Sequence, residues 1–120
     1  MKNSSLKILK IGLAITFLWI GILIFKGPEA WGTYLQPWAA DLLPVSLKTA
    51  MLGTAFLDIA IGILFLIDSL VWLAAILGVF HLSVVLIVSG VNAVTVRDIG
   101  LLSASLAVFF TYFPSFHYRR

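Results

Sequence analysis

The sequence predicts an all-α fold, a four-helix transmembrane bundle with a short amphipathic interfacial segment between the first and second helices. Hydrophobic residues make up 62% of the 120 residues and charged residues only 11%, whereas about a quarter of a soluble domain is charged. The apolar residues gather in four long runs, close to the roughly 20 residues that cross a bilayer as a helix. We expect helices because an open strand cannot satisfy its backbone hydrogen bonds in lipid.

The first span is expected at residues 6–25. Lys7 and Lys10 lie in its first turns, where their long side chains can reach the head groups, and Gly27 with Pro28 ends the span. This run is longer than the 7–15 apolar residues of a secretion signal and does not end in small residues. We therefore expect a span that is retained in the protein.

A loop at residues 27–44 follows the first span. Its apolar side chains recur at positions i, i+4, i+7 and i+11 of one helical face, namely Trp31, Leu35, Trp38 and Leu42. Pro28 suits a first helical position, and Pro37 is expected to divide the segment in two. Because indole rings prefer the head-group zone, we expect Trp31 and Trp38 to anchor one or two short helices on the outer surface. A lid over a cavity between the spans is the alternative.

We expect the remaining spans of this single domain, residues 1–120, at 47–67, 70–90 and 95–113. Ser46 is suited to cap the second span. The two-residue break at Asp68 and Ser69 suits a tight helical hairpin at a membrane face. Thr95 and Asp98 have the spacing of a capping box, which would begin the fourth span.

Basic residues at the ends of the spans predict the orientation. With four spans both termini share one side, which would carry five Lys and Arg residues against three on the other side. Because cytoplasmic loops carry an excess of Lys and Arg, we expect a multi-pass protein of the cell membrane with both termini in the cytoplasm. The net charge of +3 does not indicate nucleic-acid binding, since the basic residues lie at span borders and not in one patch.

Two ionisable residues, Asp58 and His81, lie near the middle of the second and third spans. These spans are expected to run antiparallel from a tight turn, so the two side chains fall at similar depth and can meet. A lone Asp at a helix centre costs about 2.5–3.5 kcal/mol on insertion scales, so Asp58 needs a partner. Small residues at spacings of four from Asp58, including Thr54 and Gly62, favour close helix packing around it.

Three interpretations of this polar centre of Asp58, His81 and Thr54 stay open. It is a hydrogen-bonded pair that only fixes helix register, or a proton-relay or ligand site, for instance for a quinone head group, or part of a metal or haem site. The last is the weakest, because zinc takes three or four ligands and the other histidine, His117, follows the fourth span. With no cysteine, disulfides and thiolate metal sites are excluded, and we expect no metal.

A second polar group, Asn92, Arg97 and Asp98, lies at the outer start of the fourth span. In the simpler interpretation Asp98 stabilises the helix N-terminus and Arg97 reaches the head groups. In the alternative these residues form a polar mouth above the bundle. The sequence contains no Gly-rich phosphate loop, nucleophile elbow or H-x-x-x-H pair. We therefore expect no independent catalytic activity and name no catalytic residue.

Four segments carry a family resemblance: IGLAITFLWIG at residues 11–21, PEAW at 28–31, FLDIAIG at 56–62 and VRDIGLL at 96–102. In their order and spacing they resemble the DoxX family of small four-span membrane proteins, over roughly residues 8–113. The resemblance implies a four-helix membrane bundle, and named members are associated with terminal quinol oxidase and thiosulfate:quinone oxidoreductase systems. In this family the acid of the second span, here Asp58, is often Glu. Distant relatives use cysteine pairs, which this chain lacks.

From these observations we expect an accessory or membrane subunit of a quinone-linked respiratory oxidoreductase. Its partners would be the lipid bilayer and oxidoreductase subunits, with no nucleic acid and with self-association left open, and quinone is the one cofactor considered. A small proton-coupled transporter in which Asp58 cycles a proton is one alternative. A membrane scaffold or chaperone without catalytic activity is the other.

Overall fold

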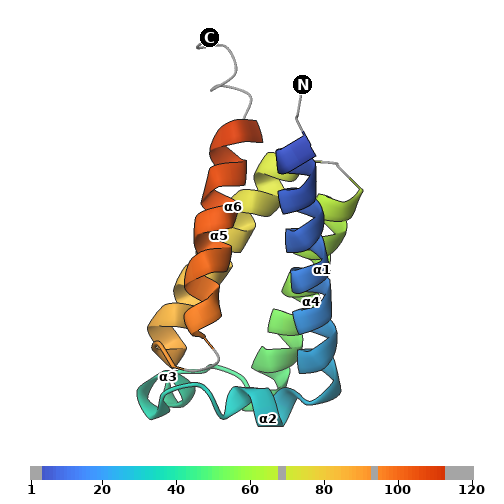
Figure 1. The fold of residues 1–120 in the computed structure, drawn as a ribbon. Helices are drawn as coiled ribbons and strands as arrows, with labels where there is room; N and C mark the ends of the chain where they lie inside the picture. Colours follow the sequence, from blue (N-terminus) through green and yellow to red (C-terminus); the bar gives the residue numbers. More distant parts are fainter. Residues whose placement is uncertain (1–3, 68–69, 93–94, 113–120) are drawn as a thin grey trace.

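The structure is a computed structural model that describes residues 4–67, 70–92 and 95–112, and helices dominate these ranges (Figure 1). The long helices are α1 (Ser4–Lys26), α4 (Leu47–Leu66), α5 (Val71–Ser89) and α6 (Val96–Tyr112). Two short helices, α2 (Pro28–Gly32) and α3 (Pro37–Asp41), lie between α1 and α4. The described residues contain no strand, so the all-α prediction is confirmed.

The helix starts follow the predicted local signals. Pro28 and Pro37 each stand in the first turn of a short helix, where a missing backbone N–H costs nothing. Ser46 caps α4, because its hydroxyl oxygen accepts a 3.1 Å hydrogen bond from the backbone N–H of Thr49. The two-residue break expected at Asp68 and Ser69 lies outside the described residues.

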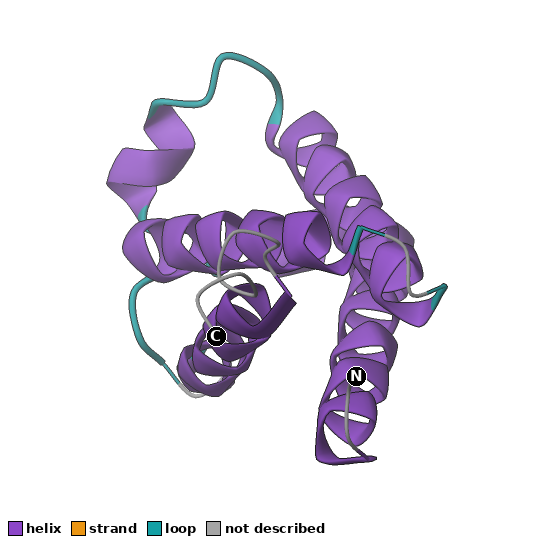
Figure 2. Cartoon of the chain, turned by 90° about the horizontal axis from the view of Figure 1, so that it is seen from above, coloured by secondary structure: helices purple, strands orange, loops and turns teal. Residues whose placement is uncertain are grey.

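The long helices pack as two pairs, α1 with α4 and α5 with α6 (Figures 1 and 2). Glycines permit the close approach of α1 and α4. A Cβ atom on Gly21 would lie 2.9 Å from the carbonyl oxygen of Ala55, and one on Gly62 would lie 3.0 Å from that of Ala14. A larger residue at either position would push the two helix backbones apart, so the close packing of α1 against α4 depends on these two glycines.

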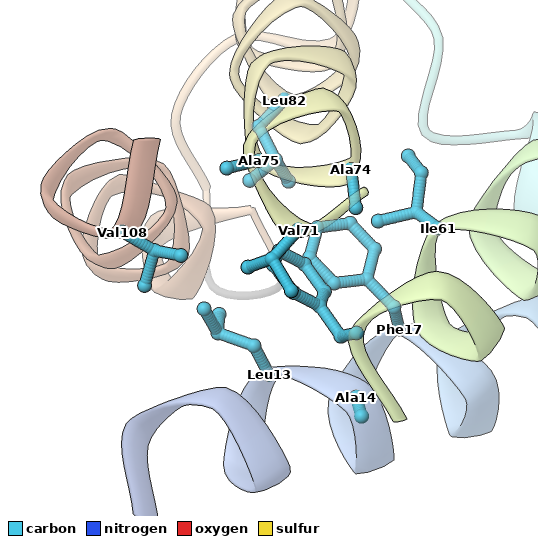
Figure 3. Packing of buried hydrophobic residues seen from close by; sticks show 10 residues of the cluster. Leu13, Ala14, Phe17, Ile61, Val71, Ala74, Ala75, Leu82 and Val108 are labelled. Atoms are coloured by element: carbon cyan, nitrogen blue, oxygen red, sulfur yellow. The ribbon is translucent and has the colours of Figure 1, made fainter. Parts of the chain in front are cut away.

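A buried apolar cluster joins the two pairs near the start of α1 and the end of α6 (Figure 3). The rings of Phe17 and Phe65 lie 6.0 Å apart at its centre. Ala74 of α5 and Val108 of α6 close around them and are fully buried. The pairs are therefore held together at one end, and the opposite end is covered by α2 and α3 (Figure 1).

Three helices, α1, α4 and α5, are long and apolar enough to cross a membrane. Large apolar side chains point outward, with Trp19 of α1 65% exposed, Phe80 of α5 67% and Ile87 of α5 64%. Such a surface is stable against lipid and costly in water. The chain is accordingly a helical membrane protein.

Candidate functional site

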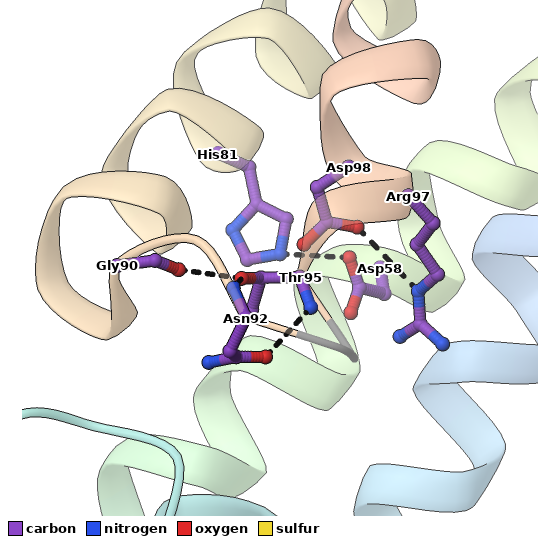
Figure 4. Close-up of polar contacts among 7 residues, drawn as sticks. All are labelled: Asp58, His81, Gly90, Asn92, Thr95, Arg97 and Asp98. Carbon is purple, nitrogen blue, oxygen red and sulfur yellow. Dashed lines mark hydrogen bonds and ion pairs between the residues drawn. The ribbon is translucent and has the colours of Figure 1, made fainter.

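Asp58 of α4 and His81 of α5 meet in the interior of the bundle (Figure 4). The imidazole Nε2 lies 2.8 Å from the carboxylate Oδ1, and the side chains of His81 and Asp58 are only 10% and 3% exposed. An ionised carboxylate has acceptor sites only, so the imidazole N–H donates. The contact predicted from the depth of these residues is confirmed.

A cavity of about 240 Å³ begins at this pair and extends toward α2 and α3. Its walls are apolar for the most part, with Phe17 and Ile20 from α1, Met51 from α4 and Leu82 from α5. Asp58 and His81 stand in the wall beside them, together with Thr54. The Thr54 hydroxyl donates to the carbonyl oxygen of Ala50 at 3.2 Å, and its oxygen keeps its capacity to accept a hydrogen bond. The three residues of the predicted polar centre therefore share one cavity.

Arg97 and Asp98 line the same cavity from the first turn of α6. The Arg97 Nε lies 3.6 Å from Asp98 Oδ1, and the Asp98 side chain is 6% exposed against 44% for Arg97. The guanidinium also lies over the ring of Trp31, 6.0 Å from its centroid, within the range of a cation–π contact. Both residues thus face the cavity rather than serving only the helix end and the head groups.

Asn92 takes a different part from the one predicted. It is outside the cavity lining, and its Oδ1 accepts from the Thr95 backbone N–H at 3.0 Å. The Thr95 hydroxyl accepts from the Asn92 N–H and donates to the carbonyl oxygen of Gly90. The predicted capping box between Thr95 and Asp98 is wrong, because the Asp98 backbone N–H donates to the carbonyl oxygen of Thr95 and not to its hydroxyl.

The loop residues divide between two environments. Trp31 and Leu35 line the cavity, whereas Trp38 is 47% and Leu42 74% exposed. Pro37 divides the segment in two as predicted, since α2 ends at Gly32 and α3 begins at Pro37, and the four apolar residues therefore do not share one helical face. The backbone N–H of Gln36 donates to the carbonyl oxygen of Val88 at 2.9 Å, which ties the connection between α2 and α3 to the end of α5.

Several lining residues were not singled out from the sequence. Tyr34, Met51, Val84 and Val88 all face the cavity. Apolar residues in a membrane span look alike in sequence, whichever side they face. The usable signal was position, since Val84 and Val88 follow His81 by three and seven residues and so continue its helical stripe. In the described ranges no three His, Cys, Asp or Glu residues are arranged to hold a metal ion.

Comparison with models of protein families, with curated proteins and with solved structures finds no match to this chain. The likeness to the DoxX family therefore rests on the four sequence segments alone.

Proposed function

We propose that this protein binds a quinone head group in the membrane and serves a quinone-linked respiratory oxidoreductase as a DoxX-type accessory subunit. One observation carries the ligand class: the Asp58–His81 pair, 2.8 Å apart, stands in the wall of an otherwise apolar cavity. Few polar groups in an apolar enclosure are typical of small-molecule sites. The oxidoreductase as partner draws on the family resemblance.

The chemistry of the wall suits a quinone and its reduced form. A quinone is a flat apolar ring with two carbonyl oxygens that accept hydrogen bonds, and a quinol carries hydroxyls that also donate. The second carboxylate oxygen of Asp58 is an acceptor for a quinol hydroxyl, and the Arg97 guanidinium is a donor for a carbonyl oxygen. The pair of Asp58 and His81 provides a place where a proton released by the ring can be held.

The size of the cavity suits one ring. An engineered apolar cavity of about 150 Å³ holds benzene, so about 240 Å³ accommodates a six-membered ring with small substituents. Sites for whole drug-sized molecules start near 300 Å³. The ring would therefore be enclosed and any long chain would remain outside.

In this proposal α6 is the fourth span and the termini lie in the cytoplasm. Its 17 residues cover about 26 Å at 1.5 Å per residue, close to the roughly 30 Å of the hydrocarbon core. The start of α1 and the end of α6 lie at one end of the bundle, and α2 and α3 at the other (Figure 1). The short helices then form the outer, interfacial cover of the cavity.

Tryptophan fluorescence of the purified protein tests the ligand class. Trp31 lines the cavity, so decylubiquinone bound there quenches its emission at close range. We expect saturable quenching that Trp31→Phe removes in large part and Trp38→Phe leaves in place. Asp58→Ala should weaken binding by about tenfold or more, because a hydrogen bond to a charged group is worth about 1.5–3 kcal/mol.

Two results would count against the proposal. Quenching that rises linearly with added decylubiquinone and is the same in Asp58→Ala would mean partitioning into detergent, not binding. Purification from native membranes in mild detergent, with neither quinone nor an oxidoreductase subunit attached, would remove the accessory role.

A further inference from the structure

We infer that the cavity takes its ligand sideways from the lipid, through a portal between α4 and α5 at Val84. We further infer that this ligand is a quinone-type ring carrying an apolar chain. The inference rests on the proposed function and adds to it the route by which the ligand enters and the residue that selects a ring with an apolar chain. Three observations carry it: the facing sides of α4 and α5, the position of Val84, and the cover at the α2–α3 end.

The facing sides of α4 and α5 are joined at the Asp58–His81 contact and separate beyond it. Toward the α2–α3 end, Thr54 and Ala50 continue the stripe of Asp58 at spacings of four, and Val85 and Val88 continue that of His81. All four of these residues line the cavity. In a packed pair of helices these two stripes would touch each other. Here the cavity lies between them.

Val84 belongs to the cavity and to the outer surface at once. It lines the cavity, yet it is 54% exposed. Ser89, the last residue of α5, follows five positions later, so Val84 lies about 7.5 Å inside the helix end. At that depth the exposed side of an apolar helix meets acyl chains. Because Val84 borders both the cavity and the lipid, it marks the place where the cavity opens to the lipid.

The α2–α3 end is covered by specific contacts. A Cβ atom on Gly32 would lie 2.7 Å from the Leu47 side chain, so α2 sits directly against the start of α4. The Gln36 N–H bonds to the Val88 carbonyl oxygen, and the Arg97 guanidinium lies over Trp31. Tyr34, which is 40% exposed, and Arg97, whose side chain is 44% exposed, also line the cavity at this end, but both are polar, whereas Val84 offers a route along an apolar side chain.

The portal determines which part of the ligand is recognised. The ring lies among the polar groups of the cavity, and the chain passes Val84 into the lipid. A larger side chain at position 84 takes the space of the chain but leaves the ring site intact. Position 84 therefore discriminates between chain-bearing and chainless rings.

Binding of decylubiquinone and of the same ring without its chain, measured by Trp31 quenching in nanodiscs, tests the portal. Val84→Phe should weaken decylubiquinone binding about tenfold or more, the effect of crowding a hydrophobic site, and should weaken binding of the chainless ring much less. The matched control is Ile87→Phe, on the same helix and 64% exposed but not in the cavity lining. Val84→Ala, which opens the portal, should speed decylubiquinone association.

The outcomes separate the portal from the site itself. If the unaltered protein binds neither ring, the proposed function fails and the portal with it. If it binds both, and Val84→Phe matches Ile87→Phe while Val84→Ala does not change the association rate, the site stands and the portal is refuted. Equal weakening of both rings by Val84→Phe would place the ring itself at residue 84 and would also overturn the inference.

Discussion

The contact between Asp58 and His81 should contribute a measurable coupling energy to folding. The perturbation is a double-mutant cycle with Asp58→Asn, His81→Ala and the combined variant. Asparagine keeps the shape of the side chain and removes its charge, and alanine removes the donor. The non-additive part of the unfolding free energies then reports what the carboxylate charge adds to the contact, because the asparagine oxygen can still accept a hydrogen bond from His81.

The geometry sets the expected size. Removing one partner of a buried ion pair costs about 3–5 kcal/mol in soluble proteins. Polar contacts within bilayers couple by about 0.6 kcal/mol on average and about 1.7 at most. With atoms 2.8 Å apart and side chains 3% and 10% exposed, we expect about 1.5 kcal/mol, near the upper bilayer value. That corresponds to roughly a tenfold change in the unfolding equilibrium.

Unfolding in mixed micelles with increasing dodecyl sulfate, followed by circular dichroism, gives the four free energies. A parallel cycle between Asp58→Asn and Ser103→Ala is the control, because the exposed Ser103 hydroxyl donates to the carbonyl oxygen of Ile99. We expect no coupling in that cycle. A value below about 0.3 kcal/mol for Asp58 and His81, within the scatter of independent sites, would refute the reasoning.

Three further predictions concern packing and topology. Gly62→Ala should destabilise the bundle by about 1–3 kcal/mol in the same unfolding assay, whereas Gly53→Ala, whose Cβ would meet no atom within 4 Å, should be neutral or stabilising; equal effects would contradict the α1–α4 packing. Ser105→Ala should stabilise by about 1 kcal/mol, because its buried hydroxyl has no hydrogen-bond partner among the described residues; a loss of stability would contradict this. The chain has no natural cysteine, so single substitutions report topology: an impermeant thiol reagent added to intact cells should label Ser46→Cys and not Ser5→Cys, and the reverse pattern would invert the orientation.

The helices could be predicted from the sequence because their causes are local. The apolar runs mark the long helices, residues such as Pro28 and Ser46 mark where helices start, and the described ends of the long helices lie within two residues of the predicted ones. The pairing of α1 with α4 was not predicted. Gly21 and Gly62 make that contact, but Gly53 also stands in a predicted span and a Cβ atom on it would meet no atom within 4 Å.

The polar pair was predictable and the cavity was not. Asp58 and His81 can be identified from the sequence because an ionisable side chain is costly in lipid and the two residues lie at matching depths in their spans. The cavity depends on how the two helix pairs diverge, which no run of residues encodes. Trp31 and Trp38 have the spacing of one helical face in the sequence, but they stand on two separate helices and only Trp31 lines the cavity.

The most direct measurement is photo-crosslinking with an azidoquinone in nanodiscs, with the labelled residues identified by mass spectrometry. Binding between the helix pairs predicts label on cavity residues such as Met51 and Val85, suppressed by excess decylubiquinone and reduced in Asp58→Ala. Label on the outward residues Phe80 and Ile87 that excess decylubiquinone does not suppress, with the cavity unlabelled, would contradict a quinone site at Asp58 and His81.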